Sequence, residues 1–184
     1  MKTNDEYGQF IKPTEVRLVR LLPGPVERLW EYLVDDEKRS RWFAGGPLER
    51  KVGGKLTLIK NDAKLAGSET PPPEFQQSSC GESMPGVVTR YEPPRVLAYI
   101  FGQSGQSQVT FELIPQGDQV QLVLTHRSGG SDTPLLNNFA AGWHTFLDHL
   151  TATLTGAPRP PLWALHSKYR SDYEKLRGTS QPIS

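Results

Sequence analysis

The sequence contains one cysteine, Cys80, among 184 residues. An internal disulfide needs two cysteines, so none can form within the chain, and this cysteine usage is typical of a reducing compartment. Cys80 follows a Ser/Gln-rich stretch with no histidine near it in the sequence. We therefore interpret it as an inert loop cysteine in preference to a reactive thiol.

Long apolar runs are absent as well. No run of about 18 apolar residues, the length that spans a bilayer, occurs anywhere in the sequence. The first 15 residues lack the apolar centre of a signal peptide. We expect a soluble, cytoplasmic protein with no membrane insertion.

The sequence has no surplus of charge of one sign. Charged residues make up 22% of the chain, and the formal net charge is +1. Nucleic acids and anionic membranes attract strongly basic surfaces, which this composition does not supply. We expect neither class of partner.

The familiar catalytic and nucleotide-binding motifs are missing. The sequence has no G-x-S-x-G nucleophile motif, no G-x-G-x-x-G and no Walker motif. Two of the four histidines, His144 and His149, are five residues apart, which places them about 140° apart on a helix and on different faces. We expect no metal site, no cofactor and no catalytic residue of these kinds.

The most regular pattern that the sequence does contain covers residues 135–154. Its apolar side chains lie within an arc of roughly 100° on a helix of 3.6 residues per turn. These side chains are Phe139, Trp143, Phe146, Leu147, Leu150 and Leu154. The spacing predicts a long amphipathic helix, which Gly156 and Pro158 would end.

Alternating segments before this helix predict strands that pair as neighbours. The clearest pair covers residues 107–114 and 119–127, which a Pro-Gln-Gly-Asp turn joins. Alternation places one set of side chains on the face that the long helix would cover. This set is Val109, Phe111, Leu113, Val120, Leu122, Leu124 and His126.

The remaining periodic segments complete an α+β class, with an antiparallel sheet and helices on one side of it. Two short helices are expected after the first strand, one with apolar side chains from Val26 to Leu33 and one that starts near Asp35. The expected strands besides the pair above cover residues 15–22, 48–52, 55–60, 86–91 and 95–101.

Three segments lack a clear place in this scheme. Residues 1–13 are polar and are expected to be flexible, and residues 61–85 have no period and three consecutive prolines, so we interpret them as a long loop. Residues 157–184 form a tail with helical spacing from about 162 to 177. The domain itself is expected over residues 14–156.

Five sequence segments in this order resemble the START-like (SRPBCC) superfamily, in its activator of heat-shock-protein-90 ATPase homologue branch. They are LPGPVERLWEYLVDDEKRSRWF (22–43), GGKLTL (53–58), YEPPRVLAYIF (91–101), VTFELIPQGDQVQLVLTH (109–126) and GWHTFLDHLTATLTG (142–156). The resemblance implies a helix-grip (Bet v-like) fold, in which a curved sheet wraps around the long C-terminal helix. The resemblance covers about residues 14–156, and the sequence departs from the family pattern in the loop 61–85 and in the tail after Gly156.

The resemblance also implies a pocket between the long helix and the sheet, which takes a small hydrophobic molecule in many relatives. We expect that pocket to be lined by Trp30, Trp42, Phe111, Leu113, Leu122, Leu124, His126, Trp143, Phe146, Leu147 and Leu150. Aromatic residues at such spacing also commonly form a core, and His126 or His149 is also compatible with a hydrogen-bonded place at the rim of the core. The loop 61–85 is a candidate lid.

Two alternatives stay open. The resemblance implies that the chain can be a partner of a heat-shock-90 homologue with a role in the stress response. However, the eukaryotic activators carry an additional N-terminal domain. Only about 14 residues precede the first strand in this sequence, which counts against activation of the chaperone. A cyclase or hydrolase would need a titratable residue with a perturbed pKa in the pocket, for which His126 is the candidate.

Overall fold

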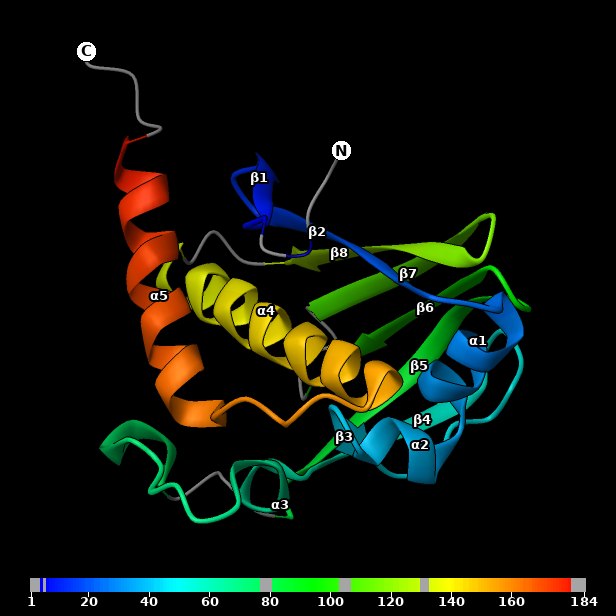
Figure 1. The fold of residues 1–184 in the computed structure, drawn as a ribbon, viewed down its shortest axis with the longest axis horizontal. Coiled ribbons are helices and arrows are strands. Elements are labelled where there is room, and N and C mark those ends of the chain that lie inside the picture. The colour runs from blue at the N-terminus through cyan, green and yellow to red at the C-terminus, as the bar shows by residue number, and fades with distance from the viewer. Residues whose placement is uncertain (1–3, 5, 77–80, 103–106, 130–132, 180–184) are drawn as a thin grey trace.

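The computed structural model describes residues 4, 6–76, 81–102, 107–129 and 133–179. Its elements follow one another as strands, short helices, strands and two long helices (Figure 1). The order is β1 (Gln9–Lys12), β2 (Glu15–Pro23), α1 (Val26–Val34), α2 (Asp36–Ser40), β3 (Ala44–Gly45), β4 (Lys55–Lys60), α3 (Asp62–Ala66), the 3₁₀ turn η1 (Pro73–Phe75), β5 (Ser83–Glu92), β6 (Val96–Phe101), β7 (Ser107–Gln116), β8 (Gln119–Ser128), α4 (Thr133–Thr155) and α5 (Leu162–Thr179).

The strands form one antiparallel sheet in the order β1-β2-β8-β7-β6-β5-β4-β3. Figure 1 shows α4 lying across one face of this sheet, with α1 and α2 at one end of it. The predicted α+β class and helix-grip arrangement are confirmed. The two short helices, α1 and α2, follow the strand predicted at residues 15–22, which is β2.

The pairing of β7 with β8 produces the inward face that alternation predicted. Phe111 lies opposite Leu124, and Leu113 lies opposite Leu122, and all four side chains are buried. The two strands are joined through Gly117, whose φ of +65° suits a residue without a side chain. The predicted inward positions at Val109, Val120 and His126 are also confirmed.

Helix α4 buries the apolar stripe that its spacing predicted. Trp143, Leu147, Leu150 and Leu154 are buried within the main core. The helix ends at Thr155, and Gly156 follows with a φ of +73°, as expected for a residue that ends a helix.

Two details of the sheet differ from the expectation. Residues 9–12, expected to be flexible, form β1, because β2 supplies hydrogen-bonding partners at the sheet edge that a local pattern does not reveal. The expected strand at 48–52 is reduced to one bridge between Leu48 and Leu56, and β3 pairs with β4 instead. The charged run Glu49 to Lys51 offers no apolar face to hold such a strand.

The loop 61–85 is also more regular than expected. It contains α3 and η1, and β5 begins within it at Ser83. Both helical pieces are too short to show a period in the sequence.

Helix α5 packs on α4 through a cluster of aromatic and polar side chains. The ring of Tyr169 stacks on that of His144 with centroids 3.7 Å apart, and its hydroxyl donates to Oδ2 of Asp148 at 2.6 Å. The hydroxyl of Tyr173 accepts from the backbone N–H of Gly8 at 2.7 Å. The tail helix is thus a packed part of the fold, joined to both α4 and the N-terminal segment.

Candidate functional site

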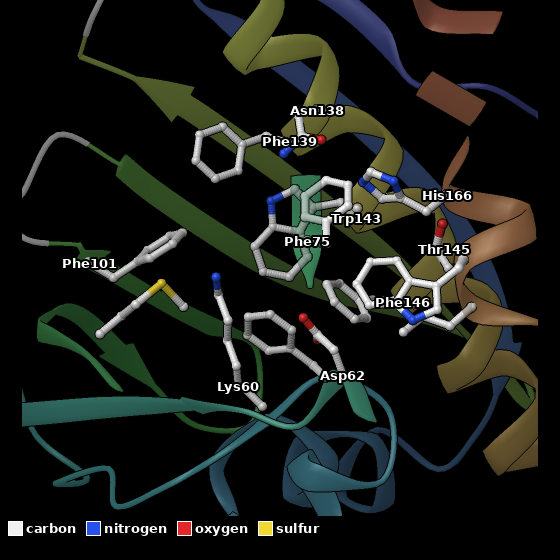
Figure 2. Close-up of a pocket in the computed structure, with 16 residues that line it drawn as sticks. Lys60, Asp62, Phe75, Phe101, Asn138, Phe139, Trp143, Thr145, Phe146 and His166 are labelled. Carbon is white, nitrogen blue, oxygen red and sulfur yellow. The ribbon is translucent and has the colours of Figure 1, made fainter. Parts of the chain in front are cut away.

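A cavity of about 310 Å³ lies between α4 and the part of the sheet formed by β4, β5 and β6. Figure 2 shows its lining, which comes from α4, from the strands opposite it, and from α3, η1 and α5 at one end. The lining residues are Phe43, Ala44, Lys60, Asp62, Phe75, Met84, Phe101, Asn138, Phe139, Gly142, Trp143, Thr145, Phe146, Leu162, Trp163 and His166.

Aromatic side chains dominate this lining. Seven of the sixteen residues are phenylalanine or tryptophan, and Met84 and Leu162 add further apolar surface. A mostly apolar concave surface with a few polar groups is the usual composition of a site for small molecules.

The wall on the α4 side is held by contacts around Trp143. Its indole Nε1 donates a hydrogen bond to Nδ1 of His126 at 2.9 Å. The ring centroids of Trp143 and Phe146 lie 4.8 Å and 5.1 Å, respectively, from that of Phe43. These contacts keep three aromatic rings together on the cavity wall.

A buried arginine fixes the chain segment that carries Phe43 and Ala44. The Arg39 guanidinium donates through Nε to the carbonyl of Ala44 at 3.0 Å and through a terminal nitrogen to the carbonyl of Gly46. Burial lowers the pKa of Arg39 from its ordinary value. The carbonyl groups compensate the desolvation of the side chain and set the path of the chain into β3.

The loop after β4 and the start of α5 close one end of the cavity together. The ring of Phe75 stacks on that of Trp163 with a centroid distance of 5.2 Å and an interplanar angle of 20°. Leu65 of α3 and Leu162 belong with Trp163 to a small apolar cluster separate from the main core. The closure therefore has its own packed core.

A carboxylate fastens this closure. Glu69 accepts hydrogen bonds from the backbone N–H groups of Leu162 at 2.5 Å, Trp163 at 3.1 Å and Ala164 at 3.2 Å. The first N–H groups of a helix have no partner within the helix, and they carry positive partial charge. Glu69 thus caps α5 from a position 93 residues earlier in the chain.

Lys60 and Asp62 lie on one side of the cavity, across from Asn138 and His166 (Figure 2). The Lys60 ammonium pairs with the Glu82 carboxylate at 2.6 Å. Partial burial raises the pKa of Asp62 to about 6, although the nearby Lys60 opposes the shift.

On the opposite side, His166 is buried, and burial lowers its pKa to about 4. Its Nδ1 and the Oδ1 of Asn138 make no hydrogen bond within the described ranges of the chain. The Thr145 hydroxyl donates to the carbonyl of Ala141 at 2.9 Å. At neutral pH this side of the cavity is therefore polar but uncharged.

The structure separates the eleven residues predicted to line a pocket into two groups. Trp143 and Phe146 lie on the cavity wall. The others pack outside that lining, in the core or at its edge; they are Trp30, Trp42, Phe111, Leu113, Leu122, Leu124, His126, Leu147 and Leu150. These side chains fill the space between the sheet and the helices that pack on it.

His126, the candidate for acid–base chemistry, lies outside the cavity lining. It is fully buried, and its ring stacks on that of Phe139 at 4.2 Å. Burial lowers its pKa to about 3. The neutral ring forms part of the core behind Trp143.

Several residues of the lining carry no mark in the sequence that predicts their place there. Lys60 and Asp62 stand at the end of a strand and the start of a short helix, where no motif marks them. Phe75 lies within residues 61–85, which show no regular apolar spacing. Trp163 and His166 belong to α5, and the sequence does not show what α5 packs against. The one available signal was the helical spacing of the tail, which shows an apolar face but not its partner.

Other kinds of site find no support in the part of the chain that the structure describes. No group of three or more His, Cys, Asp or Glu side chains there could hold a metal ion. No helix within the same residues is long and apolar enough to cross a membrane. Cys80 lies outside the described residues.

Comparison with known proteins agrees with this architecture. The model of the family described as Activator of Hsp90 ATPase homolog 1-like protein matches residues 23–155. No curated protein matches the chain.

Solved structures resemble the chain over most of its length. The protein encoded by gene BPP1335 from Bordetella parapertussis is 40% identical, with a TM-score of 0.78, over 93% of this chain and 90% of that one. CalU16 from Micromonospora echinospora is 20% identical, with a TM-score of 0.64, over 92% and 94% of the two chains. EF2215 from Enterococcus faecalis, a conserved protein of unknown function, is 19% identical, with a TM-score of 0.67, over 97% and 93%.

Proposed function

The chain belongs to the Activator of Hsp90 ATPase homolog 1-like family, a branch of the START-like superfamily, and we propose that it binds a small hydrophobic molecule in the cavity under α4. The observation that supports this proposal is the cavity of about 310 Å³ with its aromatic lining. A concave, mostly apolar surface around a space of this volume is typical of sites that bind small molecules.

Apolar burial would supply most of the binding free energy. A ligand that loses about 250 Å² of apolar surface to the cavity gains about 6 kcal/mol, at roughly 25 cal/mol per Å². Part of this gain is lost when the ligand loses its freedom of motion. A dissociation constant between about 40 μM, if the whole gain were kept, and the millimolar range is thus within reach of apolar contacts alone.

Native mass spectrometry of freshly purified protein, repeated under denaturing conditions, tests the proposal first. We expect an excess mass of a few hundred daltons in the native spectrum that disappears on denaturation. Its accurate mass would then identify the class of ligand. A native mass equal to that of the chain would mean that no ligand stays bound through purification, and a screen of apolar molecules would then decide the proposal.

Gly142 gives a way to fill the cavity without disturbing the core. It lies on the cavity wall in α4, and a Cβ atom added there would have only the Phe146 ring nearby, at 3.9 Å. We expect Gly142→Leu to fold and to lose at least tenfold in affinity for a hydrophobic ligand found by screening. Gly142→Ala is the matched control, which we expect to keep the affinity and to gain about 0.5–1 kcal/mol in stability.

The two variants make the proposal falsifiable. Equal ligand affinity of Gly142→Leu and Gly142→Ala, measured by calorimetry, would place the ligand elsewhere. Failure to find any ligand in a screen of apolar molecules of up to about 20 heavy atoms would reject the binding function itself.

A second candidate function is partnership with a heat-shock-90 homologue, which the family membership favours. It predicts a complex that forms through the surface and needs no occupied cavity. The test is the ATP turnover of the chaperone with and without this protein. Unchanged turnover and no complex by size-exclusion chromatography would reject it.

A further inference from the structure

The Asp62 carboxyl group differs from the other charged groups near the cavity. It lies on the cavity wall, and Figure 2 shows it on the same side as Lys60. Within the described ranges its side chain makes no hydrogen bond or ion pair, whereas the neighbouring Lys60 pairs with Glu82 at 2.6 Å. A carboxylate of the wall is thus available to a ligand.

The charged groups around Asp62 leave a net negative charge. Lys60 on β4 contributes one positive charge, while Asp62 on α3 and Glu82, just before β5, contribute one negative charge each. His166 faces the cavity from α5 and is neutral at physiological pH, since burial lowers its pKa to about 4. When Asp62 is ionised, the balance is one negative charge.

The aromatic lining favours the same sign of ligand. Seven phenylalanine and tryptophan side chains surround the space next to Asp62. The face of an aromatic ring carries partial negative charge and attracts cations, most strongly where water is excluded. Aromatic rings together with one carboxylate are the groups that recognise organic ammonium ions.

We propose that the cavity binds an organic cation, an amine or quaternary ammonium group on an apolar body, with Asp62 as its counter-ion. This inference depends on the proposed function, because it names the class of ligand for the same cavity. The apolar body would lie among the aromatic rings, and the cationic group would lie next to the Asp62 carboxylate.

The pH dependence of binding follows from the environment of Asp62. Partial burial and the Glu82 charge raise its pKa to about 6, against the opposing effect of Lys60. A bound cation stabilises the ionised carboxylate, so affinity should increase as the pH rises through 6. His166 stays neutral through this range and should not contribute.

Two probes of matched shape separate charge from apolar contact. Phenyltrimethylammonium carries a permanent positive charge, and tert-butylbenzene has the same shape without it. We expect calorimetry or NMR titration at pH 7.5 to show about tenfold tighter binding of phenyltrimethylammonium. Its affinity should fall severalfold at pH 5, while that of tert-butylbenzene should stay constant.

Two variants assign the effect to Asp62. We expect Asp62→Asn to lose both the preference for the cation and its pH dependence, and to bind tert-butylbenzene as the unmodified chain does. Asp118→Asn is the control, since it makes the same change of charge at an exposed turn between β7 and β8. It should leave both affinities unchanged.

The outcomes distinguish this inference from the function on which it depends. Equal binding of both probes by the unmodified chain would overturn the cation preference and leave the apolar cavity intact. Binding of neither probe would count against both proposals. A preference for the cation that survives in Asp62→Asn would overturn the role of Asp62.

Discussion

Trp143 donates a hydrogen bond of 2.9 Å from its indole Nε1 to Nδ1 of His126, which joins the middle of α4 to β8. Because burial lowers the pKa of His126 to about 3, its ring is neutral at physiological pH. Since Nδ1 accepts the hydrogen bond, the proton of the neutral ring is on Nε2. One polar contact in the core therefore sets the position of an aromatic ring on the cavity wall.

We predict that Trp143→Phe lowers the free energy of unfolding by about 2–3 kcal/mol. The change leaves His126 Nδ1 buried without its donor and removes part of a packed ring. Denaturant unfolding measures the loss. Trp163→Phe is the control, because its indole makes no hydrogen bond among the described residues; a loss as large as that of Trp143→Phe would show that ring size alone matters.

Removal of the carboxylate in Glu69→Ala should loosen the first turn of α5. Three N–H groups lose their acceptor, and a cap of this kind contributes about 1–2 kcal/mol. Hydrogen exchange at the amides of Leu162, Trp163 and Ala164 should become about tenfold faster. Glu74→Ala, which breaks an exposed ion pair with Arg170, should have little effect on these amides.

Tyr173→Phe tests how the tail helix is attached. Its buried hydroxyl accepts from the Gly8 N–H at 2.7 Å and lies 3.0 Å from Nδ1 of His144, so its loss should cost about 1–3 kcal/mol. Thermal unfolding and exchange of the Gly8 amide provide the measurements. Tyr91→Phe removes a hydroxyl without a described hydrogen bond, and the prediction fails if both variants lose the same stability.

Acid should destabilise the protein through its four histidines. Burial lowers the pKa to about 3 for His126 and His144, and to about 4 for His149 and His166. The unfolded chain binds protons near pH 6.5, where the folded chain does not. The stabilisation is therefore complete above pH 6.5 and is lost as the pH falls toward 4.

Melting temperatures measured at intervals from pH 8 to pH 4 check this prediction. We expect a plateau above pH 6.5 and a continuous decrease below it. NMR spectra of the histidine rings should show no titration between pH 8 and pH 5. Titration of all four rings near pH 6.5 in the folded protein would contradict the prediction.

Local patterns in the sequence determined the class of the fold. The apolar spacing of residues 135–154 and the alternation of the β7–β8 hairpin depend only on which face of an element meets water. Each pattern extends over ten residues or more, so it identified α4 and the inward positions of Phe111 and Leu124 without knowledge of any distant contact.

The position of the cavity depended on tertiary structure. The predicted lining combined inward residues of the sheet, one face of α4 and two tryptophans near the short helices, but most of these side chains, such as Leu122 and Leu150, are buried in the core. The open space lies beyond that core, where Phe75 and Trp163 meet. These two residues are 88 positions apart in the sequence, and no local pattern pairs them.

Local patterns therefore identified the longer elements in their order, their buried faces and the family to which the chain belongs, whereas β1, α3 and η1 left no such pattern. Only the packing of the elements determines where the cavity lies, and that Glu69, Phe75 and α5 close one end of it. The physical reason is that periodicity reports the solvent exposure of a single element. A cavity is instead the space left between several elements, and its size and polar groups follow only from how those elements pack.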